Sequence, residues 1–222
     1  MSPDGRSLID DEILRAAQAE KPKVCFVPTA MGDSITGIQR FEDSFAGRAD
    51  ASVLSLFCQE PWGYRDPQML LDQDVIYVGG GSTANLLALW RLHGLPEVLR
   101  EASSRGTILA GISAGANCWF EASSTDSFGA LAPLRDGLGF LNGSFCPHYL
   151  DEDSRRPCFQ QWIAEGELPA GYAADDFCAL RFEDGKFMEA IAEREDRPFA
   201  VVGSRGEEVH APRLLKDQPT GA

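Results

Sequence analysis

Short apolar segments alternate with amphipathic stretches along the first half of the chain, and this alternation limits the folds that it can adopt. The apolar segments end at Pro, Gly or Asp, and most are apolar on both faces, as buried parallel strands are. They predict strands over residues 24–27, 52–57, 75–78 and 107–110. The amphipathic stretches predict helices over residues 8–19, 36–46, 83–92 and 96–103. This order predicts an α/β fold with a mostly parallel sheet between layers of helices.

The order of elements changes after Tyr149. A polar, acidic stretch leads into a helix expected around residues 157–164. Two apolar segments separated by Asp184-Gly185 predict a β-hairpin with a tight turn over residues 179–192. A further strand is expected near residues 199–202, and the tail from 216 to 222 is expected to fray. No repeat or linker interrupts the sequence, so residues 1–222 are predicted to form one domain.

A glycine-flanked serine follows the fourth predicted strand. Gly111-Ile112-Ser113-Ala114-Gly115 lies between that strand and helix-forming residues, which is the pattern of a nucleophile elbow. Such a turn lifts the hydroxyl out of the sheet, next to the N–H groups and positive dipole end of a helix that favour a nearby oxyanion. The pattern predicts that Ser113 is a nucleophile, and the alternative is a glycine-rich loop without chemistry.

A serine nucleophile needs a base, and the chain has only three histidines. His93 follows a predicted helix and precedes Gly94, as basic residues at helix C-termini do, and His210 lies in a polar segment expected at the surface. His148 follows an apolar stretch and is the candidate base by elimination, unless it is a buried structural histidine. A carboxylate would orient its ring. Spacing leaves four candidates open: Asp126, Asp175, Asp176 and Glu183.

A second glycine-rich loop, Gly79-Gly80-Gly81-Ser82-Thr83, joins the third predicted strand to a helix. It lacks the spacing of the common phosphate-binding patterns. Ligands of parallel α/β sheets bind at the carboxyl ends of the strands, where both this loop and the Ser113 turn are expected. The loop is therefore interpreted as one half of an oxyanion hole, shared with the amide of Ala114.

Charge and cysteine content exclude several classes of protein. The chain carries 34 acidic and 20 basic residues, a net charge of −14, which disfavours binding to nucleic acid or to an anionic membrane. No segment is long and apolar enough to span a bilayer, and the N-terminus lacks the order of a secretory signal, so a cytoplasmic location is expected. The six cysteines form no C-x-x-C pair, so neither zinc nor disulfides are expected. Cys25, Cys58 and Cys178 are expected to be buried.

Several segments, taken together in their order along the chain, resemble the peptidase E and cyanophycinase family, most closely bacterial peptidase E-like proteins. The resemblance runs from about residue 22 to residue 194. The segments that carry it are Val78-Gly79-Gly80-Gly81-Ser82-Thr83-Ala84-Asn85, Gly111-Ile112-Ser113-Ala114-Gly115-Ala116-Asn117, Ser124-Thr125-Asp126-Ser127, Cys146-Pro147-His148-Tyr149 and Gly171-Tyr172-Ala173-Ala174-Asp175-Asp176.

The resemblance implies a flavodoxin-like fold, also called class I glutamine amidotransferase-like, which is a three-layer sandwich. It also implies a Ser-His-acid site that needs no cofactor or metal. Ser113 matches the family nucleophile and His148 the base. Asp176 matches the third member, which is commonly Glu, and Asp126 is the alternative acid.

The resemblance also implies how substrate is held. Gly81 and Ala114 match the backbone donors of the oxyanion hole. Arg155 lies near the position of the family arginine that binds the substrate's aspartate side chain, and Arg156 is the alternative because the loop lengths differ. A guanidinium paired with a carboxylate through two hydrogen bonds would select acidic residues.

Two departures from the family pattern affect these expectations. Ser82 stands where the family usually has Asn, which puts substrate contacts there in doubt. Relatives begin with a further strand and glycine-rich turn before the region that matches Leu8, so either the first strand of the sheet is missing or the chain starts late.

The predicted function is a serine exopeptidase that cleaves small peptides, with dipeptides carrying N-terminal Asp as the leading substrate. The alternatives are a hydrolase of cyanophycin, β-aspartyl peptides or esters, and a noncatalytic relative that binds small molecules. The expected partner is a small peptide. A homodimer is also considered, since closed symmetric pairs are common among such domains.

Overall fold

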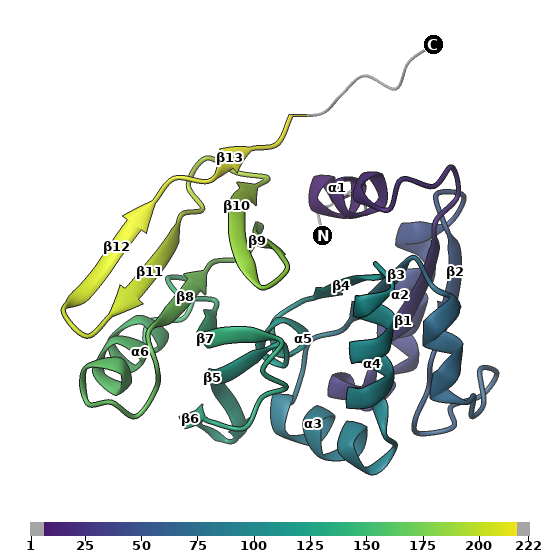
Figure 1. Ribbon diagram of the computed structural model, residues 1–222, viewed down its shortest axis with the longest axis horizontal. Helices are drawn as coiled ribbons and strands as arrows, with labels where there is room; N and C mark the ends of the chain where they lie inside the picture. Colours follow the sequence, from purple (N-terminus) through teal and green to yellow (C-terminus); the bar gives the residue numbers. More distant parts are fainter. Residues whose placement is uncertain (1–6, 217–222) are drawn as a thin grey trace.

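A four-stranded parallel sheet forms the N-terminal half of the computed structural model, which describes residues 7–216 (Figure 1). Its strand order is β2-β1-β3-β4. The strands are β1 (Lys23–Val27), β2 (Asp50–Val53), β3 (Val75–Val78) and β4 (Ile108–Gly111). Every neighbouring pair is parallel, and Val78 at the end of β3 pairs with Gly111 at the end of β4. The carboxyl ends of these strands therefore meet at one edge of the sheet.

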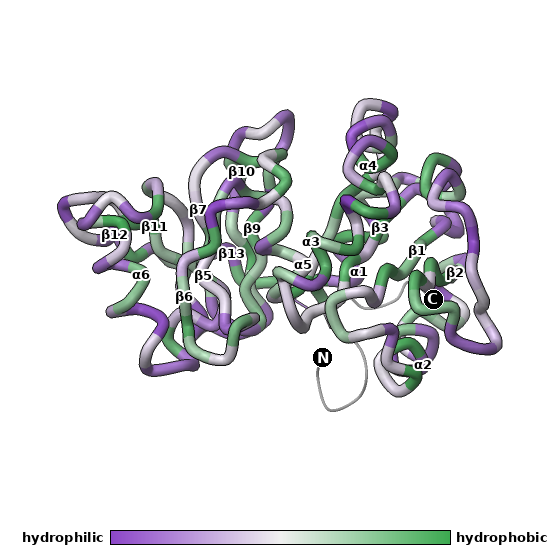
Figure 2. Tube along the Cα trace, turned by 90° about the horizontal axis from the view of Figure 1, so that it is seen from below, coloured by the Kyte–Doolittle hydropathy of each residue, from purple (hydrophilic) through white to green (hydrophobic). Residues whose placement is uncertain are grey.

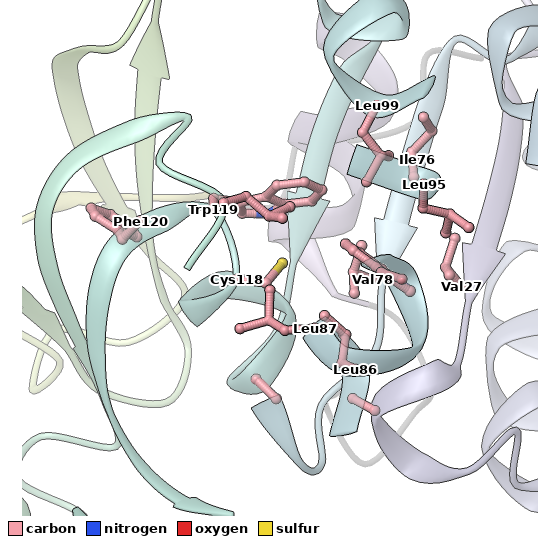
Figure 3. Packing of buried hydrophobic residues seen from close by; sticks show 14 of the residues in the cluster. Val27, Ile76, Val78, Leu86, Leu87, Leu95, Leu99, Cys118, Trp119 and Phe120 are labelled. Carbon is pink, nitrogen blue, oxygen red and sulfur yellow. The ribbon is translucent and has the colours of Figure 1, made fainter. Parts of the chain in front are cut away.

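Helices cover both faces of this sheet. They are α1 (Leu8–Ala16), α2 (Ile35–Phe45), α3 (Thr83–Leu92) and α4 (Leu95–Ser104), with the short 3-10 helices η1 (Thr29–Met31) and η2 (Pro67–Asp72) between them. Side chains alternate in direction along a strand. Phe26 and Tyr77 consequently pack with α1 and α2, whereas Val27, Ile76 and Val78 pack with α3 and α4 (Figure 3). This arrangement is a three-layer sandwich.

A short helix, α5 (Ala114–Asn117), leads from β4 into a six-stranded mixed sheet. That sheet has the order β12-β11-β8-β7-β5-β6, in which β5, β7 and β8 are parallel and the remaining pairs are antiparallel. Its strands are β5 (Phe120–Phe128), β6 (Ala130–Leu134), β7 (Leu141–Pro147), β8 (Gly171–Ala174), β11 (Phe199–Gly203) and β12 (Gly206–His210). Figure 2 shows α3 and α5 between this sheet and the N-terminal one.

The remaining elements complete the C-terminal half. Helix α6 (Arg155–Ala164) packs Phe159 and Ile163 against the mixed sheet. A three-stranded sheet has the order β13-β10-β9 and consists of β9 (Cys178–Glu183), β10 (Lys186–Ala192) and β13 (Arg213–Leu214). Phe120, in β5, stacks on Phe145 and meets Phe182 edge to face, so an aromatic cluster joins the second and third sheets.

The α/β class and the parallel sheet between helices are confirmed, but the bounds of the strand expected over 52–57 are wrong, because the strand covers Asp50–Val53. β2 ends at Val53 because a buried carboxylate draws the following residues away from the sheet. Asp33 Oδ2 accepts hydrogen bonds from the Ser55 hydroxyl, at 2.7 Å, and from the Phe57 amide, at 2.9 Å. The expected burial of Cys58 is also wrong, because its side chain is exposed in the loop that follows.

The other expected elements differ from the structure mainly at their ends. Helix α1 stops at Ala16 rather than continuing to 19, and Gln18 has a φ of 54°, which no helix accommodates. The hairpin turn is confirmed, with φ values of 49° at Asp184 and 74° at Gly185. Residues 217–222 of the expected frayed tail lie outside the described residues. Within residues 7–216, no helix has the length and apolar character to cross a membrane.

Candidate active site

Ser113 lies in a strained turn between β4 and α5. Its φ of 53° and ψ of −110° belong to a region that non-glycine residues seldom occupy. A close approach of the backbone keeps this turn in place, because a Cβ on Gly115 would fall on the carbonyl of Val78, well inside the 3.0 Å that real Cβ atoms keep. The sequence pattern Gly-x-Ser-x-Gly therefore forms the predicted elbow, with the Ser113 side chain at the carboxyl edge of the parallel sheet.

His148 follows β7, so the second sheet supplies the partner of Ser113. Its Nε2 lies 3.0 Å from Ser113 Oγ, within hydrogen-bond distance. The ring is partly shielded, with 24% of the side chain exposed, and the residue has a φ of 54°. Of the other histidines, His93 ends α3 and His210 stacks on Phe199 at the surface, as expected.

Asp176 follows β8, the parallel neighbour of β7, and reaches the other side of the imidazole. Its Oδ1 lies 2.5 Å from His148 Nδ1. The adjacent ends of β7 and β8 explain this meeting, because Pro147 pairs with Ala174 in the sheet. The structure thus brings Ser113, His148 and Asp176 into one hydrogen-bonded row.

The three other candidate acids point elsewhere. Asp175 is buried, its carboxylate accepts the Leu150 amide at 2.5 Å, and desolvation raises its pKa. Glu183 forms an ion pair with Arg181 at the surface. Asp126 faces the buried guanidinium of Arg155, at 3.8 Å. Asp176 is consequently the candidate whose carboxylate contacts the His148 ring.

The glycine loop lies against Ser113. A Cβ on Gly80 would meet Ser113 Cβ at 3.3 Å, and Gly81 adopts a φ of 134° beside the carbonyl of Ala30. Within residues 7–216, the amides of Gly81 and Ala114 have no hydrogen-bond partner. Ser82, by contrast, caps α3: its hydroxyl accepts the Asn85 amide at 3.3 Å. Two free N–H groups are therefore available near the serine. The Ser82 hydroxyl accepts a helix-capping bond and keeps its own O–H as a donor.

The two arginine candidates lie in different surroundings at the start of α6. Arg155 is 3% exposed, and its Nε donates to Glu152 Oε2 at 2.6 Å. Its Nη1 is buried and finds no hydrogen-bond partner among the described residues. Arg156 is half exposed and forms an ion pair with Glu207. Of the two, Arg155 is thus the arginine with a buried nitrogen that has no hydrogen-bond partner among the described residues.

Among the described residues, the cysteines form no disulfide and no cluster of side chains is arranged to bind a metal. All six cysteines are free, and burial raises the pKa of Cys25 and Cys146 to about 12, which keeps these thiols protonated and unreactive. Within the part of the chain that the structure describes, no group of three or more His, Cys, Asp or Glu side chains is arranged to hold a metal ion.

Two residues near the site were not singled out from the sequence. Asp151 accepts the Asp176 amide with its Oδ2, at 3.2 Å, and Arg197 donates to Asp151 Oδ1, at 2.5 Å. Asp151 belongs to the polar, acidic stretch after Tyr149, to which the sequence alone assigns no function. Arg197 lies 49 residues beyond His148 in sequence, and no local pattern connects the two.

Solved structures with a similar fold are known. A peptidase from an acI-B1 actinobacterium superposes with a TM-score of 0.68 at 17% identity, over 92% of this chain and 87% of that one. A putative peptidase E protein from Listeria monocytogenes EGD-e gives a TM-score of 0.53 at 19% identity, over 92% and 93% of the two chains. At these identities the likeness establishes the fold, which is that of peptidase E proteins.

Sequence comparison establishes the family. The uncharacterized peptidase YgaJ of Bacillus subtilis (strain 168) is 49% identical over 218 residues, which are 97% of this chain and 93% of the relative. Peptidase E of Streptomyces coelicolor (strain ATCC BAA-471 / A3(2) / M145) is 29% identical over 158 residues, 66% of this chain and 63% of the relative. The profile of peptidase family S51 matches residues 2–190. The chain therefore belongs to peptidase family S51.

Proposed function

We propose that this chain is a serine peptidase that hydrolyses short peptides, and that Ser113, His148 and Asp176 form its catalytic triad. One observation carries the proposal: the His148 ring lies between the other two side chains, 3.0 Å from Ser113 Oγ and 2.5 Å from Asp176 Oδ1. A nucleophile, a base and a group that orients the base in this geometry are the recurring parts of serine hydrolases.

In the proposed mechanism His148 is neutral at the start, with its Nδ1 proton donated to Asp176 and its Nε2 free to accept. Ser113 Oγ attacks the peptide carbonyl while Nε2 takes the hydroxyl proton. The amides of Gly81 and Ala114 donate to the oxyanion of the tetrahedral intermediate. His148 then protonates the leaving amine, and an acyl-enzyme on Ser113 remains. Water activated by the same ring hydrolyses it and frees the serine.

For the acyl side of the substrate we propose an N-terminal aspartate, with Arg155 as the group that binds the carboxylate of its side chain. Arg155 has a buried Nη1 without a partner, and Asp126 faces its Nη2 at 3.8 Å, beyond hydrogen-bond distance. A substrate carboxylate that displaces Asp126 would gain a charge-assisted hydrogen bond that Asp126 itself does not make. Aspartyl dipeptides are therefore the first substrates to test.

The test is amino-acid release from a dipeptide panel, namely Asp-Leu, β-Asp-Leu, Glu-Leu, Asn-Leu and Ala-Leu, together with labelling by a fluorophosphonate probe. We expect hydrolysis of Asp-Leu in preference to the others, and covalent label on Ser113 located by mass spectrometry. Ser113→Ala should lower kcat/KM at least about 1000-fold and abolish labelling, because no other group supplies the nucleophile. Ser103→Ala, an exposed serine on α4, is the matched control.

The outcomes separate the alternatives. Hydrolysis of β-Asp-Leu alone would replace the proposed substrate by a β-aspartyl peptide and leave the triad in place. Labelling of Ser113 without cleavage of any dipeptide would redirect the search to esters or longer peptides. A folded protein that neither labels nor cleaves would contradict the proposed catalytic activity.

A further inference from the structure

The two loops that carry His148 and Asp176 are joined by hydrogen bonds from the backbone of each loop to a carboxylate of the other. We call this set of contacts, made by Asp151 and Asp175, the brace. The Asp175 carboxylate accepts the amides of Leu150, at 2.5 Å, and Asp151, at 3.3 Å, and so holds the loop that follows His148. In return, the Asp151 carboxylate accepts the amide of Asp176, at 3.2 Å. Each loop thus supplies an acceptor for the backbone of the other.

Arg197, in the segment before β11, completes this brace. Its Nη1 donates to Asp151 Oδ1 at 2.5 Å, and only 18% of its side chain is exposed. Its guanidinium carbon lies 5.9 Å from the ring centroid of Phe177, the residue that follows Asp176. The same guanidinium therefore approaches both loops, one through a carboxylate and the other through an aromatic ring.

The turn after Asp176 needs such support. Phe177 has a φ of 64°, which a side chain of this size rarely adopts. The Phe177 carbonyl accepts the Glu193 amide at 2.9 Å, and the guanidinium carbon of Arg194 lies 3.7 Å from its ring centroid. The Asp176 side chain itself is 49% exposed, so water competes for its carboxylate. Packing alone does not hold this side chain against His148.

We propose that Arg197 and Asp151 are positioning residues of the Ser113 site: Arg197 fixes the Asp151 carboxylate, which fixes the Asp176 backbone so that its side chain reaches His148. The inference rests on the proposed function, since it assigns these residues a part in the same hydrolysis. Neither residue touches the reacting atoms. Arg197 comes from a part of the chain remote in sequence from both loops that it joins.

The charges around His148 make this role distinguishable from a merely structural one. The acidic groups on the packed loops are Asp175, Asp176 and Asp151, with Glu152 one residue further and Asp196 beside Arg197 at 3.6 Å. The basic groups are Arg197 and Arg194, over Phe177. The hydrogen bond from Arg197 lowers the pKa of Asp151, so the pair is ionised at neutral pH. Removal of one partner therefore leaves the opposite charge near the imidazole.

The experiment compares Asp151→Asn, Arg197→Met and the double variant in the full chain. Two readouts are taken: kcat and KM for Asp-Leu over a range of pH, and the titration midpoint of the His148 ring by NMR. The chain has three histidines, so the His148 signals are assigned from the spectrum that lacks them in His148→Gln. Asp136→Asn and Arg213→Met, which break surface ion pairs on other elements, are the matched controls.

We expect kcat to fall at least about tenfold in either single variant, with KM within about twofold of the wild-type value. The reason is that the site still binds substrate, whereas the Asp176 side chain is no longer held against His148. The His148 midpoint should move to lower pH in Asp151→Asn, which loses a nearby negative charge, and to higher pH in Arg197→Met, which leaves one uncompensated. The double variant should lose no more activity than the worse single variant, since both substitutions remove the same interaction between Arg197 and Asp151. Arg197→Lys should recover part of kcat.

Opposite shifts of the midpoint are a result that general loosening of the loops does not produce. Equal midpoints in all variants, or a change in KM alone, would overturn the positioning role. If wild-type protein cleaves no peptide yet the midpoints move as stated, the proposed function fails and the brace stands. If wild type cleaves Asp-Leu and the variants match it, the brace fails alone. Should Arg197→Met not fold, Arg197→Gln, which also removes the positive charge, carries the same comparison.

Discussion

At the scale of single residues, the site is marked by backbone strain. Ser113, His148 and Phe177 all have positive φ values, of 53°, 54° and 64°, although none is glycine. Such conformations cost on the order of 1–3 kcal/mol each and persist where the surrounding structure holds them. Here two turns present the Ser113 and His148 side chains to each other, and the third follows Asp176.

Gly81 is the residue of the glycine loop that tolerates substitution least. A Cβ there would collide with the Ala30 carbonyl, and its φ of 134° is unfavourable for any L side chain. We expect Gly81→Ala to lower the free energy of unfolding by more than about 1 kcal/mol and to reduce kcat, because the amide is displaced. Urea unfolding and dipeptide kinetics measure both. Gly47→Ala, also at positive φ but with open space around the Cβ, should cost less and leave kcat alone.

Substitution of the two acids tests which of them completes the triad. Asp176→Asn replaces the acceptor of the Nδ1 proton by a group that can donate, which favours the wrong tautomer of His148, so kcat should fall on the order of 1000-fold or more. Asp126→Asn removes a charge near Arg155 and should change KM for Asp-Leu more than kcat. The reverse pattern in steady-state kinetics would make Asp126 the third member.

At the scale of elements, α1 is attached to the sheet through buried polar groups. Ser7 caps the helix by accepting the Asp10 amide, and its hydroxyl donates to Glu193 at 2.5 Å. Asp10 is 3% exposed and accepts the hydroxyl of Tyr77, in β3, at 2.9 Å. Burial raises the pKa of Asp10 above its usual 3.8. The contact between α1 and the sheet therefore includes a buried carboxyl group that binds its proton more tightly in the folded protein than in the unfolded chain.

This raised pKa predicts a pH dependence of stability. The folded state binds the Asp10 proton more tightly than the unfolded chain, so acidification favours folding through this group. As the pH falls from neutral toward the usual Asp value of 3.8, wild type should gain stability relative to Asp10→Asn, which keeps an acceptor for Tyr77 but has no proton to bind. Urea unfolding of both proteins at each pH measures the difference. A difference that stays constant or shrinks on acidification would contradict the assignment to Asp10.

At the scale of the whole molecule, one apolar cluster runs through both halves. Ile76, of the parallel sheet, belongs to the same cluster as Phe145 and Phe199, of the mixed sheet. Trp119 and Phe120 lie where the chain passes from one to the other (Figure 3). A shared core couples the unfolding of the two sheets, because neither can open without exposing the other.

The shared core predicts a single cooperative unfolding transition, in agreement with the expected single domain. Tryptophan fluorescence and far-UV circular dichroism should give coincident urea curves. Phe120→Ala should lower the free energy of unfolding by about 3–5 kcal/mol in both signals, whereas Phe128→Ala, whose ring is exposed, should cost about 0.5 kcal/mol or less. Two separated transitions would indicate two domains.

Much of the site could be predicted from local sequence. The apolar strand, the glycines around Ser113 and the Gly79-Gly80-Gly81 loop specify an elbow and a neighbouring turn through steric constraints that act within a few residues. Elimination left His148 as the candidate base because the chain has so few histidines. The boundaries of β2 and the exposure of Cys58 were missed, since a distant carboxylate, Asp33, withdraws that segment from the sheet.

The sequence by itself determined the alternation of strands and helices, the elbow at Ser113 and the family, because these depend on periodicity, backbone sterics and residues in order. Only the tertiary structure decided which acid meets His148, since Asp175 and Asp176 are adjacent in sequence and point in different directions once β7 and β8 pair. The burial of Arg155 and the brace from Arg197 were decided in the same way. They depend on segments far apart in the chain, whose approach is set by packing of the whole core rather than by any local pattern.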